Sequence, residues 1–62
     1  MNIENSVWVN GYHVYHMNRE EDARKHAKNW WFNIRENLQT TVEAYGKDGR
    51  LIFMNGREYY VS

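Results

Sequence analysis

Residues 42–60 have the sequence VEAYGKDGRLIFMNGREYY, which contains two turn signals between short apolar segments. The dipeptide Asn55-Gly56 is a strong local signal for a type I′ β-hairpin, because Asn tolerates a positive φ and Gly adopts one freely. Residues 46–49, GKDG, form a second turn, in which Gly49 in the left-handed region would close a three-residue loop. The stretch therefore predicts three antiparallel strands. The expected pairs are Tyr45–Leu51, Ala44–Ile52, Val42–Met54, Met54–Arg57 and Ile52–Tyr59.

Residues 6–17 predict a further hairpin. Apolar residues alternate on both sides of Asn10-Gly11, which is again the sequence of a type I′ turn. The expected pairs are Val9–Tyr12 and Val7–Val14 on one face, and Trp8–His13 on the other.

Residues 19–38 predict one amphipathic helix. Asn18 is a favourable N-cap, and Glu21 three residues later completes a capping-box pattern. Apolar residues follow at helical spacing. They are Ala23, Ala27, Trp30, Trp31, Ile34 and Leu38. The fold class is therefore α+β: one domain over residues 1–62, with a single helix packed on a small antiparallel sheet in the order β-β-α-β-β-β.

Composition excludes several classes of protein. Eight basic residues balance eight acidic ones in 62 residues, so the chain is neither a strongly basic nucleic-acid module nor an acidic mimic. The absence of Cys removes disulfides, thiolate zinc sites and a Cys nucleophile. No apolar run is long enough for a membrane span or a signal peptide, which predicts a cytoplasmic protein with no membrane partner.

Neither a metal site nor a catalytic site is expected. His13 and His16 are three residues apart on a predicted strand, which places them on opposite faces, and no zinc-type spacing occurs. The acidic residues 20–22 are explained by the start of the helix, and Ser6 lies outside any nucleophile-elbow context. We therefore expect a non-enzymatic protein without a metal or a cofactor.

The predicted strand registers separate an aliphatic face from an aromatic one. The aliphatic face suits the apolar stripe of the helix, and one helix covers only one face of a sheet. The second face would carry Trp8, Tyr15, Tyr45, Leu51, Phe53 and Tyr60. Such a patch is typical of a contact surface, although a twisted sheet covered by its own tails is the alternative. A register slip of one residue would invert the two faces.

A second candidate contact surface lies on the outward side of the predicted helix. It consists of Arg24, Lys28, Phe32 and Arg35. An ordinary solvated face of an amphipathic helix is the alternative interpretation of these residues.

The small size, the single helix beside a sheet and the stretch of residues 42–52, VEAYGKDGRLI, resemble compact proteins encoded by phages and mobile elements, anti-CRISPR proteins among them. This resemblance implies docking onto a larger protein or nucleoprotein complex and inhibition by steric occlusion. Such inhibitors share no functional motif, so no residue role is carried over. Two alternatives stay open: a single-stranded nucleic-acid binder that stacks bases on its aromatic residues, and a homodimer closed by the aromatic face.

Overall fold

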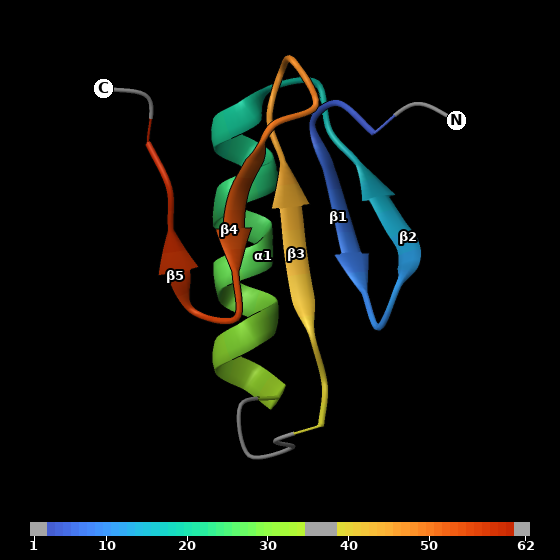
Figure 1. Cartoon of the computed structure of the whole chain (residues 1–62), viewed down its shortest axis with the longest axis vertical. Coiled ribbons are helices and arrows are strands. Elements are labelled where there is room, and N and C mark those ends of the chain that lie inside the picture. The colour runs from blue at the N-terminus through green and yellow to red at the C-terminus, as the bar shows by residue number, and fades with distance from the viewer. Residues whose placement is uncertain (1–2, 35–38, 61–62) are drawn as a thin grey trace.

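The computed structural model describes residues 3–34 and 39–60, which form an α+β fold in the expected element order (Figure 1). The elements are β1 (Ser6–Val9), β2 (Tyr12–His16), α1 (Glu20–Ile34), β3 (Val42–Tyr45), β4 (Leu51–Met54) and β5 (Arg57–Glu58). The strands form one antiparallel sheet in the order β2-β1-β3-β4-β5. The expected helix end at residue 38, with Arg35 and Leu38, lies outside the described residues. No helix in the described ranges has the length and apolar character needed to cross a membrane.

The two Asn-Gly turns have the backbone that the sequence predicts. Asn10 and Gly11 have φ of 52° and 82°, and Asn55 and Gly56 have φ of 47° and 93°, so both central residues of each turn are left-handed. Gly49, with φ of 81°, also adopts the expected conformation. The pairs Val9–Tyr12, Trp8–His13, Tyr45–Leu51 and Met54–Arg57 are confirmed.

Both turn asparagines also bind the start of the central strand. Asn10 Oδ1 accepts a hydrogen bond from the Thr41 N–H at 3.0 Å, and the Asn10 N–H donates to the Thr41 carbonyl at 2.9 Å. Asn55 makes the same pair of bonds with Val42, at 2.8 Å and 3.0 Å. Neighbouring residues of a strand direct their backbone groups to opposite sides. The two hairpins therefore hold β3 from its two sides.

The core lies between α1 and one side of the sheet. Its buried residues are Val7, Ala23, Ala27, Val42, Ala44, Ile52 and Phe53, with Trp30, Trp31 and Ile34 partly buried against them. The helical residues are those of the predicted apolar stripe. Figure 1 shows α1 behind β3 and β4, with the opposite side of these strands uncovered.

A β-bulge in β4 corrects the predicted register. Ala44 pairs with Phe53 instead of Ile52, and Glu43 pairs with Met54, so Ile52 is the extra residue. Because a bulge shifts the alternation by one residue, the adjacent side chains of Ile52 and Phe53 are both buried, each at 1% exposure. The expectation that Phe53 belongs to an exposed aromatic face is therefore wrong, and Met54 takes a place on the uncovered side.

A second bulge, in β2, has the same effect. Val7 pairs with Tyr15 and Ser6 with His16, which leaves Val14 as the extra residue. Tyr15 therefore lies on the helix side of the sheet. Its ring is 4.0 Å from that of His26 and 6.0 Å from that of Trp30, between centroids. The prediction that Tyr15 shares a face of the sheet with Trp8 is wrong for this reason.

The hydrogen bonds of Asn55 lead to a stability prediction. Asn55→Ala removes the acceptor for the buried Val42 N–H, and it places in the turn a residue that tolerates a positive φ less well than Asn does. We expect a loss of about 2 kcal/mol in the free energy of unfolding, measured by urea denaturation. Asn29→Ala, on the exposed side of α1, is the control and should stay within about 0.5 kcal/mol of wild type. Equal effects of the two variants would contradict the account.

Candidate interaction surface

The side of the sheet away from α1 is called the open face. Residues that pair across adjacent strands have their side chains on the same face of the sheet. The strand pairing therefore gives the rows of side chains that run across the open face. One row runs across all five strands and the second across four of them. The rows are His13–Trp8–Glu43–Met54–Arg57 and His16–Ser6–Tyr45–Leu51.

Trp8 is fixed in place by its neighbours on this face. Its indole N–H donates a hydrogen bond to Ser6 Oγ at 3.0 Å, and the buried Ser6 hydroxyl in turn donates to the Ile3 carbonyl. The His13 ring stacks on the indole with centroids 5.1 Å apart and planes at 18°. The Tyr45 ring stands nearly perpendicular to it, at 83° and 6.4 Å. These contacts hold the Trp8 indole in one orientation within the protein.

His13 and His16 lie on the same face, in contrast to the sequence-based expectation. The bulge at Val14 shifts the alternation between them, and their rings are 6.3 Å apart at 80°. His13 Nε2 lies 2.9 Å from the Tyr15 carbonyl oxygen, which only accepts, so this nitrogen carries a proton and donates. Within residues 3–34 and 39–60, no three His, Cys, Asp or Glu side chains are grouped as metal ligands.

Glu43 and Tyr45 form a polar pair at the centre of the open face. The Tyr45 hydroxyl donates to Glu43 Oε2 at 3.3 Å. Partial burial, and then the neighbouring Glu43 carboxylate, raise the pKa of Tyr45 above its ordinary value, so the phenol stays protonated and available as a donor.

The structure brings together only two of the five aromatic residues predicted for one surface. Trp8 and Tyr45 lie on the open face and are half-buried. Tyr15 and Phe53 face the helix side, as described above. Tyr60 also lies on the helix side. Glu58 pairs with Phe53 and shares its face, and the side chain of Tyr60, two residues later, lies on the same side as that of Glu58. Sequence reasoning missed His16 and Met54 as members of this face, because the sequence carries no local signal for either bulge.

The second predicted surface does not form as expected, because Arg24 is buried at 4% exposure. Its guanidinium lies over the Tyr60 ring, 4.3 Å from the centroid, and donates to the Tyr59 carbonyl at 3.1 Å. It also pairs with Glu20, at 3.6 Å, and with Glu21. The residues after β5 cover this part of α1, so Arg24 is a structural cation and not part of a solvated face.

Lys28 is likewise engaged within the protein. Its ammonium group lies 3.2 Å from Glu58 Oε2, and Glu58 Oε1 accepts from the Tyr60 hydroxyl at 2.7 Å. The Tyr60 hydrogen bond, followed by the Lys28 interactions, holds the pKa of Glu58 below its ordinary value. Phe32 remains on the helix surface at 55% exposure. Of the predicted helix surface, Phe32 and the partly exposed side chain of Lys28 therefore remain accessible in the described chain.

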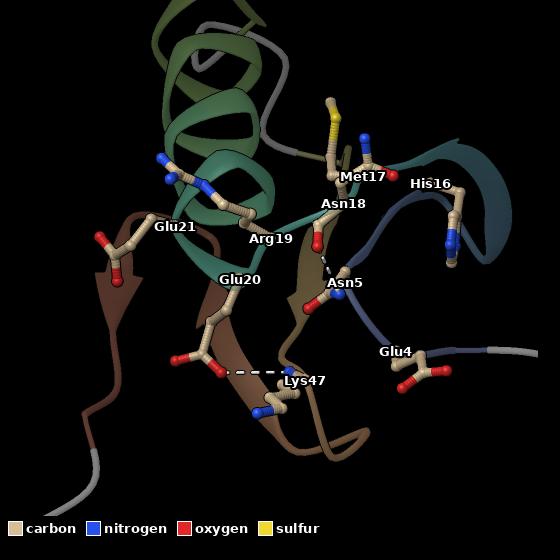
Figure 2. Close-up of a pocket in the computed structure, with 9 residues that line it drawn as sticks. All are labelled: Glu4, Asn5, His16, Met17, Asn18, Arg19, Glu20, Glu21 and Lys47. Carbon is tan, nitrogen blue, oxygen red and sulfur yellow. Dashed lines mark hydrogen bonds between the residues drawn. The ribbon is translucent and has the colours of Figure 1, made fainter.

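A shallow groove lies at the start of α1. It is lined by Glu4, Asn5, His16, Met17, Asn18, Arg19, Glu20, Glu21 and Lys47 (Figure 2). Glu20 Oε1 accepts from the Lys47 N–H at 3.1 Å, and the Asn5 side-chain amide donates to the Asn18 carbonyl at 3.4 Å. A Cβ at Gly46 would overlap the Glu20 carboxylate, so glycine there lets the turn approach the helix. These contacts join the helix to the sheet.

Comparison with known proteins found no match. No family model fits the chain, and no curated protein or solved structure is significantly similar to it.

The environment of Glu58 leads to a pH prediction. A carboxylate whose pKa is lower in the folded than in the unfolded state stabilises the folded protein at pH values above its unfolded-state pKa. This stabilisation is lost as the pH falls through the folded-state pKa. We expect an NMR titration to give Glu58 a pKa below 4.5, the ordinary value. Tyr60→Phe and Lys28→Met should each raise that pKa, because each variant removes a contact that stabilises the carboxylate. An unchanged value in Tyr60→Phe would contradict the described contact.

Proposed function

We propose that this protein is a non-enzymatic interaction protein that docks through its open face onto a larger protein or nucleoprotein complex. The observation that carries the proposal is the set of half-buried side chains Trp8, Tyr45 and Leu51, side by side where no described element covers them. Aromatic residues that are partly exposed on a flat surface are typical of the centres of protein interfaces.

The ordering of Trp8 supports docking without rearrangement. Its hydrogen bond to Ser6 and its stack on His13 fix the indole in the free protein. A side chain that is already fixed loses little conformational entropy on binding, which favours affinity. The mechanism we propose is steric occlusion of a site on the partner. This is the mode of the phage-type and anti-CRISPR-like inhibitors that the chain resembles in size and architecture.

Single-stranded nucleic acid is a less favoured partner. One side of the Trp8 ring is taken by His13, and Arg24 and Lys28 are held in internal ion pairs. The formal net charge is zero, so phosphate binding would release few counterions. A homodimer closed by the open face is the third candidate.

Two variants that each add one lysine test the docking proposal. Leu51→Lys places the charge on the open face, and Phe32→Lys places it on the exposed side of α1. Immobilised wild-type protein is used to isolate a partner from extract, and the affinity for the purified partner is then measured. We expect Leu51→Lys to weaken binding about tenfold or more and Phe32→Lys to leave it unchanged.

Three results would contradict the proposal. Weakening by Phe32→Lys alone would assign contact to the helix. Binding that falls steeply with salt for an oligonucleotide, and not for a protein, would favour the nucleic-acid alternative. A wild-type dimer that Leu51→Lys dissociates would assign the open face to self-association.

A further inference from the structure

Glu43 occupies the centre of the open face. It lies on β3, the middle strand, between its register partners Trp8 and Met54, and two residues before Tyr45. Its side chain is only partly exposed. A carboxylate is therefore set in the middle of the aromatic and apolar part of this surface.

Glu43 has no cationic partner among the described residues. Five other carboxylates do have one: Glu20 and Glu21 pair with Arg24, Asp22 with Arg19, Asp48 with Arg50 and Glu58 with Lys28. The Tyr45 hydroxyl satisfies one Glu43 oxygen, Oε2, at 3.3 Å. The negative charge itself is not neutralised within the described chain.

A docked partner would remove water from this carboxylate. Burial of an unpaired charge is strongly unfavourable, so a stable interface over Glu43 needs donors from the other side, and a cation both donates and neutralises the charge. The neighbouring rings favour the same chemistry, because the faces of Trp and Tyr attract cations. Trp8 is the register partner of Glu43 on the neighbouring strand, the Tyr45 hydroxyl bonds to its carboxylate, and the two rings lie nearly perpendicular to each other.

We infer that the open face recognises an arginine side chain of the protein partner, with its guanidinium on Glu43 and against Trp8 and Tyr45. This inference rests on the proposed docking function and names the chemistry of its anchor. Arginine fits better than lysine, since a planar guanidinium makes parallel hydrogen bonds to a carboxylate while it stacks on an aromatic ring.

Among the described residues, Arg57 is the guanidinium that lies in the same row of the open face as Glu43. It is the register partner of Met54 and so lies two strands from Glu43, roughly 10 Å away at ordinary strand spacing. In a symmetric face-to-face dimer with the two strand orders reversed, Arg57 would meet Glu43 where β3 lies over the copy's β5. That arrangement leaves β1 and Trp8 beyond the edge of the copy's sheet, because β5 is the last strand. A distinct protein partner is not limited in this way and can cover the whole face.

N-acetyl-arginine amide is a probe that tests this inference without a known partner. Its neutral isostere, N-acetyl-citrulline amide, is the matched ligand control. Titration of ¹⁵N-labelled protein at constant ionic strength should give saturable shifts of the Trp8 indole N–H and the Glu43 amide. We expect citrulline to bind about tenfold more weakly, and Glu43→Gln to weaken arginine binding to a similar degree.

Glu58→Gln is the matched protein control. It removes the same charge from the helix side of the sheet and should bind the arginine probe as wild type does. Equal shifts with arginine and citrulline would overturn the inference, as would unchanged binding by a folded Glu43→Gln. A wild-type dimer in sedimentation that both Glu43→Gln and Arg57→Gln dissociate would also overturn it, in favour of a second copy.

The failure of this inference is distinguishable from the failure of the docking proposal. Partner binding that Leu51→Lys weakens but Glu43→Gln does not would leave the docking face standing and remove the arginine anchor. The reverse result is arginine binding at Glu43 together with partner binding that Leu51→Lys leaves unchanged. It would show that Glu43 binds arginine and would remove the docking proposal for the open face.

Discussion

The fold depends on two asparagine side chains that hold the central strand from opposite sides. Asn10 binds both backbone groups of Thr41, and Asn55 binds both backbone groups of Val42. Each asparagine is also a left-handed residue of its own turn, so the turn geometry and the position of β3 are set together. In a domain of 62 residues with no Cys, these bonds substitute for the covalent links that small domains often use.

The position of β3 determines what the open face presents. With its start fixed, β3 directs Ala44 toward α1 and Glu43 and Tyr45 toward the uncovered side. The strand pairing then brings Trp8 alongside Glu43. The proposed docking surface, and the arginine anchor inferred at its centre, thus follow from backbone constraints near the turns. On the helix side, Arg24 and Lys28 are paired with carboxylates, whereas Glu43 on the open face has no cationic partner among the described residues.

The sequence predicts the turns and the helix, because each depends on local chemistry: Asn-Gly at positive φ and apolar residues at helical spacing. It also predicts the faces of Trp8 and Tyr45, which lie on strands without an extra residue. It fails for Tyr15 and Phe53, because each follows a bulge. The bulge in β4 allows the adjacent side chains of Ile52 and Phe53 both to be buried, whereas Val14 and Tyr15 at the β2 bulge stay exposed. An alternating pattern encodes neither bulge. The burial of Arg24 depends on where the chain passes after β5, which is a tertiary effect.

Nuclear Overhauser contacts report which side chains lie on each side of the sheet. We expect contacts from the Phe53 ring to the methyl groups of Ala23 and Ala27, and contacts from the Trp8 ring to Tyr45 and His13. Contacts from Trp8 to the helix alanines, with Phe53 close to Tyr45, would show that the faces are inverted and would contradict the account.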